Sequence, residues 1–487
     1  MPERPSEVPV VQGEELEARV EAFGDGPDGI VRIDRYVLFV PEVIPGERVR
    51  VRVTSAARKY GRAELVEVIE SSPDRVQPRC PHFGSCGGCQ LQHLSHAAQM
   101  EEKTARLRRT LAHALRREER SLPMRPMVGP PDPWEQRTKF VLHFAERDGE
   151  LVAGFYARRS RELVGIEVCP IQEPRSVRVG LAIRDAAREL DLRVFDARDG
   201  YGHLRAALIR STATTGQVHA TLVVQTERGL PRLDRFAERV MAAGASGVAL
   251  NVNDGPPEIL LGEHMRSLAG VDSVVDDVDG VRLHSSPGAF FQTSAFGVRA
   301  LVREVRRILA DAPRDCRIAD LYCGGGLFAL ALAPSVGRVF GIEDSERAIA
   351  DAIASAQDNG IENAHFRAGT VERLLPSIAR SRDKPFAVIL DPPRAGCDDR
   401  VLRGMAKDLQ PMRVVYVSCE PSTLARDISR LEPLGYALTE ILPVDMFPHT
   451  SHIETIAVLQ RTVRREDPTA RRLYERLRRA PKPPSGA

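Results

Sequence analysis

Hydrophobic and polar residues alternate in short runs along the N-terminal part of the chain. Five runs rich in β-branched side chains are separated by Gly, Pro and Asp residues, a pattern typical of strands joined by turns. The runs are ELEARVEAF, GIVRI, YVLFV, ERVRVRVTS and RAELVEVIE. Five short strands within residues 10–72 predict a small OB-like β-barrel, a fold that often binds single-stranded nucleic acid.

The pattern becomes mixed in the middle of the chain. Residues 90–120 have apolar positions at helical spacing, whereas WEQRTKFVLHF, ELVAGFYA and HATLVVQT are typical of strands. We therefore expect residues 78–280 to form an α+β domain.

From Ser285 onward, apolar strands alternate with amphipathic helices. The strands CRIADLYCGGG, GRVFGIE, PFAVILDPPR and MRVVYVSCEP are separated by helical segments such as LFALALAP and RAIADAIASAQDNG. This alternation predicts an α/β fold over residues 285–461, with a doubly wound, mostly parallel, Rossmann-like sheet. Residues 462–487 follow as a basic tail that ends near several prolines.

Composition narrows the class of protein. With 43% hydrophobic and 28% charged residues, the chain is not disordered as a whole. It has no apolar run of about 18 residues, as a membrane helix needs, and its start lacks the features of a signal peptide. We therefore expect a cytoplasmic protein with no membrane partner.

Basic residues gather in two segments. Residues 103–125 contain eight basic and two acidic residues, and residues 461–482 contain nine and three. A solvated helix face would explain either segment alone, but the two together also favour a polyanionic partner.

A glycine-rich turn follows the first strand of the C-terminal region. The segment from Asp320 to Phe328, DLYCGGGLF, would let a ligand approach the backbone at a helix N-terminus, and Glu343 ends the next strand. A carboxylate there can accept hydrogen bonds from a ribose. These features alone fit a nicotinamide-dependent dehydrogenase as well as an S-adenosylmethionine enzyme.

The next two strand ends favour methyl transfer. Asp391 opens a Pro-Pro turn, which would present its carboxylate to the cleft, and Cys419 follows the strand VVYVS. A cysteine there is ordinarily a small buried hydrophobe, but the positive end of the following helix could lower the pKa of its thiol. Glu454 begins the last strand and by itself could be a strand-edge acid.

Three of the eight cysteines lie close together. Cys80, Cys86 and Cys89 form a C-x5-C-x2-C pattern, and a cytosolic chain would keep them reduced.

Together, these motifs resemble those of the RNA uracil-5 methyltransferases, in particular the 23S rRNA members that carry an iron–sulfur cluster. The N-terminal barrel is similar to a TRAM domain, and CPHFGSCGGCQ is similar to the cluster motif of the family. The remaining motifs occur in the family's order: FFQTS, DLYCGGGLF, GIE, DPPRAG, SCEPSTLARD and DMFPHTSHIE.

The resemblance implies roles for ten residues. A 4Fe–4S cluster would be bound by four thiolates, although spacing alone also suits zinc. The implied cluster ligands are Cys80, Cys86, Cys89 and Cys169; the implied contacts to S-adenosylmethionine are Gln292, Tyr322, Glu343 and Asp391. Cys419 would be the nucleophile and Glu454 the general base. The resemblance also favours 23S rRNA as the partner and a monomeric enzyme.

The chemistry of uracil explains this set. Carbon 5 is too weak a nucleophile to take a methyl group from a sulfonium, and a thiolate adding to carbon 6 would activate it. The uridine would have to leave its stack to be reached. Glu420 departs from the family, which usually has Asn after the nucleophile, and its charge could raise the pKa of the thiol.

Other functions stay open at this stage. They are methylation of a tRNA uridine, methylation of cytosine or of an amino group, and an RNA-binding iron–sulfur protein with an inactive methyltransferase domain.

Overall fold

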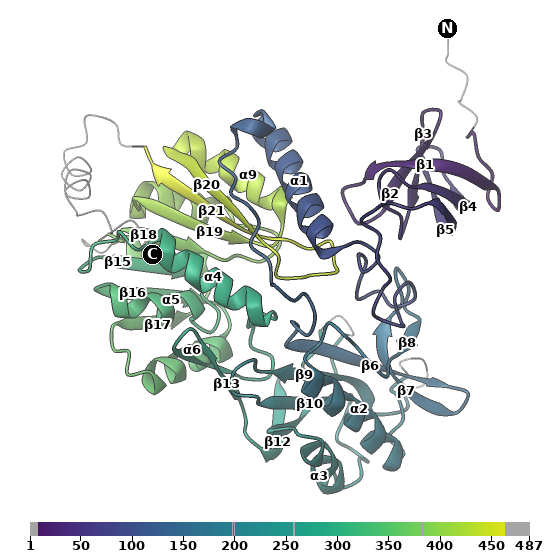
Figure 1. The fold of residues 1–487 in the computed structure, drawn as a ribbon. Helices are drawn as coiled ribbons and strands as arrows, with labels where there is room; N and C mark the ends of the chain where they lie inside the picture. Colours follow the sequence, from purple (N-terminus) through teal and green to yellow (C-terminus); the bar gives the residue numbers. More distant parts are fainter. Residues whose placement is uncertain (1–7, 197, 199, 257–258, 381–383, 463–487) are drawn as a thin grey trace.

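The computed structural model describes residues 8–196, 198, 200–256, 259–380 and 384–462. Figure 1 shows a small barrel at one end, a central sheet and a larger C-terminal α/β unit. Most of the predicted basic tail, from residue 463, lies outside the described residues. Among the described helices, none is both long enough and apolar enough to cross a membrane.

The N-terminal strands form the predicted OB-like barrel. Its strands are β1 (Glu15–Phe23), β2 (Gly29–Ile33), β3 (Tyr36–Val40), β4 (Arg48–Ala56) and β5 (Tyr60–Glu70). They close in the order β1-β2-β3-β5-β4, with β3 and β5 parallel. The valines of β4 fill the interior, while Arg48, Arg50 and Arg52 alternate with them on the outside.

These three arginines, here called the arginine ladder, are matched by glutamates on both sides. Arg52 pairs with Glu15 of β1 at 2.6 Å and with Glu64 of β5 at 3.0 Å. Arg50 pairs with Glu17 at 3.2 Å, and Arg48 likewise pairs with glutamates of both strands.

The central region is the expected mixed α+β unit. Its seven-stranded sheet has the order β12-β11-β10-β9-β6-β7-β8, and helices α2 (Pro174–Glu189) and α3 (Asp234–Ala242) pack on it. The strands are β6 (Lys139–Arg147), β7 (Glu150–Tyr156), β8 (Leu163–Gly165), β9 (Leu204–Ser211), β10 (Val218–Val224), β11 (Gly247–Val252) and β12 (His264–Gly270). A hairpin of β13 (Val274–Val278) and β14 (Val281–Ser285) leads into the C-terminal unit.

The C-terminal unit has the predicted Rossmann-like sheet. Its order is β17-β16-β15-β18-β19-β21-β20, in which the first five strands are parallel and β21 runs antiparallel to both of its neighbours, β19 and β20. The strands are β15 (Arg317–Leu321), β16 (Arg338–Glu343), β17 (Ala364–Ala368), β18 (Ala387–Leu390), β19 (Arg413–Ser418), β20 (Tyr436–Val444) and β21 (Glu454–Arg461). The helices are α4 (Ala295–Ile308), α5 (Leu327–Leu332), α6 (Glu346–Asp358), α7 (Val371–Ala379), α8 (Asp399–Gly404) and α9 (Pro421–Leu431).

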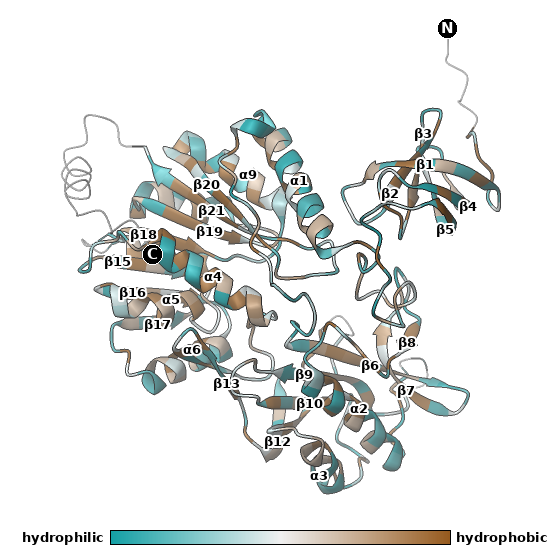
Figure 2. Cartoon of the chain, viewed as in Figure 1, coloured by the Kyte–Doolittle hydropathy of each residue, from teal (hydrophilic) through white to brown (hydrophobic). Residues whose placement is uncertain are grey.

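Strand order reverses at β15, whose neighbours are β16 and β18. Ligands of open α/β sheets bind beyond the carboxyl ends of the strands at such a point. Figure 2 shows this sheet as largely hydrophobic and the outer faces of the helices α1 (His96–Leu115) and α4 as hydrophilic, as expected for a covered sheet.

Helix α1 (His96–Leu115) precedes the central sheet in sequence but packs against α9 of the C-terminal unit (Figure 1). Leu107 and Leu111 of α1 are fully buried in the same core cluster as Leu424 and Ile428 of α9. The helix therefore joins the layer that covers one face of the C-terminal sheet.

Candidate active site

A cavity of about 570 Å³ opens at the carboxyl ends of the parallel strands. The predicted catalytic and cofactor-binding residues, scattered over 163 positions of sequence, all line it: Gln292, Tyr322, Glu343, Asp391, Cys419 and Glu454. The fold thus brings together the strand ends that the sequence marked as chemically important.

The glycine-rich turn forms one wall of this cavity. Gly324 and Gly326 have φ angles of +52° and +83°, which side chains with a Cβ rarely adopt, and a Cβ on Gly326 would lie 3.0 Å from the Phe366 ring. Glu343 ends β16 and accepts hydrogen bonds from the backbone N–H groups of Gly324, at 3.2 Å, and Ser345, at 3.0 Å. Its carboxylate is therefore held at the rim of the turn.

Asp391 directly follows β18 and lines the cavity as a half-buried residue. Its Oδ2 accepts a hydrogen bond from Gln292 Nε2 at 3.3 Å. Burial, and to a lesser degree the charge of Glu343, raises the pKa of Asp391 to about 7. Tyr322 has a φ of +65° and donates its hydroxyl to Glu372 at 3.4 Å, so its ring is fixed beside the same turn.

Cys419 and Glu454 both line the cavity, and the carboxyl group of Glu454 affects the pKa of the Cys419 thiol. Burial raises the pKa of the Cys419 thiol, and the carboxyl groups of Glu454 and Asp391 raise it further, while Arg394 opposes them. Burial likewise raises the pKa of Glu454 well above its usual value, with Asp391 adding to the effect. The cavity therefore disfavours a negative charge on both groups at once.

The expectation that the following helix lowers the thiol pKa is wrong. The N-terminus of α9 is capped by Glu420, whose carboxylate accepts hydrogen bonds from the backbone N–H of Ser422 at 3.3 Å and from its hydroxyl at 2.9 Å. Glu420 thus has a capping role, and the carboxyl groups identified as raising the thiol pKa belong to Glu454 and Asp391.

The cavity is also lined by residues to which the sequence analysis assigned no role, among them Phe290, Arg394, Phe447 and His452. Phe290 is 61% exposed, which is unusual for a phenylalanine beside a ligand-sized cavity. The sequence signal that could have identified Phe290 is its position two residues before Gln292, a predicted cofactor contact.

The loop between β20 and β21, residues 445–453, leads directly into Glu454 and is held by α1. Lys103 donates to Asp445 Oδ1 at 2.7 Å and to the carbonyl of Phe447 at 2.9 Å. Gln99 accepts a hydrogen bond from the backbone N–H of His449 at 2.8 Å. Burial raises the pKa of Asp445, but the charge of Lys103 and the hydrogen bonds from His96 and Lys103 outweigh burial and hold it below its usual value.

The cysteine segment docks against the same loop. The backbone N–H groups of Gln90 and Leu91 both donate to the carbonyl of His449 at 2.9 Å. The segment that follows Cys89 is therefore hydrogen-bonded to the loop that precedes Glu454.

The four predicted cluster cysteines line one cavity of about 230 Å³: Cys80, Cys86, Cys89 and Cys169. Burial raises the pKa of the Cys89 thiol to about 11 and that of Cys169 to about 12. Within the part of the chain that the structure describes, no three His, Cys, Asp or Glu side chains are grouped in a way that would hold a single metal ion.

The reversal of strand order at β15, the glycine-rich turn and the acid at the end of β16 would also suit a dehydrogenase, but Asp391 and Cys419, which line the same cavity, favour the class of S-adenosylmethionine-dependent methyltransferases. Comparisons with known proteins narrow this class. Residues 278–462 match the family model of tRNA (uracil-5-)-methyltransferase, and residues 9–66 match the TRAM domain.

Relatives and one solved structure cover nearly the whole chain. An RNA methyltransferase of Halalkalibacterium halodurans is 34% identical over 456 residues, which are 93% of this chain and 98% of the relative. One from Gloeobacter violaceus is 36% identical over 462 residues, again 93% and 98%. The tRNA (uracil-54, C5)-methyltransferase of Pyrococcus abyssi, solved with S-adenosyl-L-homocysteine, aligns with a TM-score of 0.72 and 27% identity over 91% of this chain and 99% of that one.

The chain therefore belongs to the RNA uracil-5-methyltransferase family. It is an S-adenosylmethionine-dependent enzyme with RNA as its substrate class, as the sequence motifs predicted.

Proposed function

We propose that the enzyme methylates carbon 5 of a uridine in 23S rRNA through a covalent adduct with Cys419. The observation that carries this proposal is that the thiol of Cys419, the carboxyl groups of Glu454 and Asp391, and the glycine-rich turn share one cavity. An enzyme that only transferred a methyl group to an amino group would not need the thiol.

The reaction uses the cavity's two coupled acids in sequence. The thiol of Cys419 releases its proton to solvent and Sγ forms a bond to carbon 6, while the displaced electron pair of the carbon 5–carbon 6 double bond moves onto the uracil carbonyl as an enolate. Carbon 5 then attacks the methyl group, and the methyl–sulfonium bond breaks to leave a neutral thioether. Glu454 removes the proton from carbon 5, and the Sγ–carbon 6 bond breaks to restore the thiolate.

The raised pKa values of Cys419 and Glu454 support this order. Since two neighbouring anions are disfavoured, the bond from Sγ to carbon 6 is favoured because it moves the negative charge away from Glu454 and onto the uracil ring. Glu454 is then the one group beside the uracil ring that still has to ionise.

The other cavity residues have binding roles. Glu343, which accepts a hydrogen bond from the glycine-rich turn, would bind the ribose of S-adenosylmethionine, and Gln292, Tyr322 and Asp391 are the remaining proposed contacts. Phe290, exposed at the cavity, would stack against an RNA base.

We also propose that the cysteine cavity holds a 4Fe–4S cluster. Two cationic side chains, Arg137 and Lys139, line this cavity, and none of its described lining residues is Asp or Glu. His82 Nε2 and Gln172 Oε1 line it as well and are buried without a hydrogen-bond partner. An anionic group bound by four thiolates fits this arrangement.

The group would supply a rigid link between two segments of chain, residues 80–89 and the segment around Cys169, rather than electrons, because methyl transfer is redox-neutral. The thiolates of Cys80, Cys86 and Cys89 would fix the segment whose continuation, Gln90 and Leu91, donates to the loop before Glu454.

A second candidate substrate is a tRNA uridine. It is favoured by the likeness to the Pyrococcus abyssi enzyme, whose name gives uridine 54 of tRNA. We choose rRNA because the sequence resembles the 23S rRNA members of the family, which carry an iron–sulfur cluster like the one proposed here. We propose a monomer on the same basis.

The deciding experiment incubates unmodified 23S rRNA and unmodified tRNA with labelled S-adenosylmethionine, followed by nucleoside mass spectrometry. Labelled 5-methyluridine in rRNA alone is expected, and Cys419→Ala should remove it while S-adenosylmethionine still binds. Label in tRNA alone would overturn the rRNA assignment. Turnover by Cys419→Ala above a few per cent of wild type would overturn the covalent mechanism.

A further inference from the structure

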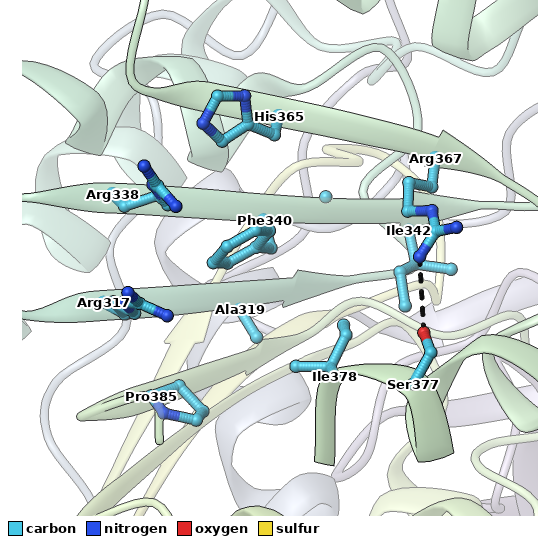
Figure 3. Close-up of a pocket in the computed structure, with 11 residues that line it drawn as sticks. Arg317, Ala319, Arg338, Phe340, Ile342, His365, Arg367, Ser377, Ile378 and Pro385 are labelled. Carbon is cyan, nitrogen blue, oxygen red and sulfur yellow. Dashed lines mark hydrogen bonds between the residues drawn. The ribbon is translucent and has the colours of Figure 1, made fainter. Parts of the chain in front are cut away.

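A second cavity, of about 270 Å³, lies on the face of the C-terminal sheet over β15, β16 and β17 (Figure 3). Helix α7 separates the two cavities: Val371 at its start lines the catalytic cavity, and Ser377 and Ile378 near its end line this one. At 1.5 Å per residue, its nine residues span about 13 Å, and Pro376 lies within the helix. The helix therefore covers only part of the sheet face.

Strand β16 crosses this cavity, and its side chains on that face change from charged to apolar along the strand. On the face toward the cavity, β16 carries Arg338, which is exposed, then Phe340, which is half-buried, and then Ile342, which is fully buried. A sheet face meant to be covered by a helix would be apolar throughout. The amino-terminal half of this face instead has the composition of a binding surface.

An aromatic pair forms the floor of the cavity. Phe340 and His365 are register partners on β16 and β17, with ring centroids 5.8 Å apart. The guanidinium of Arg338 lies 5.8 Å from the Phe340 ring. Arg367, which lines the other end of the cavity, donates a weak hydrogen bond to Ser377 Oγ at 3.4 Å.

Positive charge dominates this cavity. Three arginines line it, Arg317, Arg338 and Arg367, and none of its described lining residues is acidic. Guanidinium groups bind phosphate in a fork geometry and stack on bases, and aromatic side chains on an open sheet are a common platform for single-stranded RNA.

We infer that this cavity binds a single-stranded segment of the substrate RNA, away from the uridine that is methylated. A base stacks on Phe340 and His365, and the neighbouring phosphates contact Arg338 and Arg367. The inference rests on RNA being the substrate class and is independent of whether that RNA is ribosomal or transfer RNA.

The test measures binding of a short fluorescein-labelled single-stranded RNA by fluorescence anisotropy over a series of salt concentrations. For Arg338→Gln/Arg367→Gln, loss of two phosphate contacts should reduce the slope of log K against log salt by about 1.4. At 0.1 M salt this corresponds to roughly 25-fold weaker binding. Phe340→Leu should leave the slope unchanged but weaken binding by about fivefold or more.

The matched control is Arg232→Gln/Arg235→Gln, which removes two exposed arginines at the start of α3 in the central unit. It should bind RNA with a slope closer to that of the wild type. Binding of S-adenosylmethionine, measured by calorimetry, should be unchanged in all variants, which shows that the catalytic sheet is folded.

Equal slopes and affinities for the wild type and Arg338→Gln/Arg367→Gln would overturn the inference. So would saturable binding of uridine monophosphate that the variant loses while RNA binding is retained, because the cavity would then be a mononucleotide site. Neither result bears on Cys419, whose variant tests methyl transfer separately.

Discussion

Lys103→Met tests whether α1 holds the loop that leads into Glu454. The Lys103 and Asp445 side chains are 2% and 0% exposed, and methionine keeps the volume of Lys103 while removing its charge. Breaking a buried ion pair costs about 3–5 kcal/mol, because one charge stays buried without its partner. Since His96 still contacts Asp445 at 2.9 Å, we expect the lower end, about 3 kcal/mol.

Tryptophan fluorescence in urea is the assay. Trp134 is the only tryptophan, and its ring stacks on His449 of the same loop, with centroids 3.9 Å apart. Its emission therefore reports unfolding of this region, and circular dichroism recorded in parallel shows whether the whole chain unfolds in the same transition. Methyl transfer should also slow, because Phe447, His452 and Glu454 would no longer be held in place.

A double-mutant cycle separates the pair from general damage. Asp445→Asn alone should also destabilise, but Lys103→Met/Asp445→Asn should recover about 2 kcal/mol relative to the sum of the single changes. Glu102→Gln is the matched control, since the Glu102–Arg109 pair on the same helix is exposed and should contribute less than about 0.5 kcal/mol. A loss below about 1 kcal/mol for Lys103→Met, or costs that simply add, would refute the reasoning.

Three further predictions concern the catalytic cavity and the cysteine cavity. The pKa of Asp391 is raised to about 7, so the folded protein holds this proton more tightly than the unfolded chain and loses stability as pH rises from about 4 to 7. Asp391→Asn should therefore melt higher than wild type at pH 8 but not at pH 4 without cofactor, and should bind S-adenosylmethionine more weakly; a lower melting temperature at pH 8 would contradict this. Phe290→Ala should raise KM for RNA by about fivefold or more without changing cofactor affinity, and an unchanged KM would exclude the stacking role. Cys86→Ser should lower the iron content of anaerobically purified protein and bleach its colour, whereas Cys316→Ser, outside the cysteine cavity, should not; equal iron in both would defeat the cluster assignment.

The fold was predictable where periodicity is strong. The alternation of valine and arginine in β4 and the apolar runs of β15, β18 and β19 are local signals, and both the barrel and the Rossmann-like sheet are confirmed. The packing of α1 on α9 was not predictable, because an amphipathic helix does not identify its partner. The domain boundaries stay predictions.

The site was predictable to the extent that strand ends carry it. Glu343, Asp391 and Cys419 each follow or end a strand, so their convergence follows from the topology of a parallel sheet. Phe447 and His452 lie in a loop without periodicity and gave no comparable signal. The direction of the thiol pKa was mistaken because the pKa depends first on burial and then on Glu454 and Asp391, and neither burial nor the proximity of these two acids is a local property of the sequence around Cys419.

The arginine ladder of the barrel has a consequence for how the barrel strands align. Arg52, Arg50 and Arg48 stand opposite Glu64, Glu67 and Glu70 of β5, and the first two also stand opposite Glu15 and Glu17 of β1. A shift of β4 by one residue would turn its arginines into the interior, and a shift by two would leave an arginine without an acid across from it. The ladder thus encodes a single alignment of three strands, and it does so with charges that cancel one another, so this side of the barrel adds little to the long-range attraction of RNA.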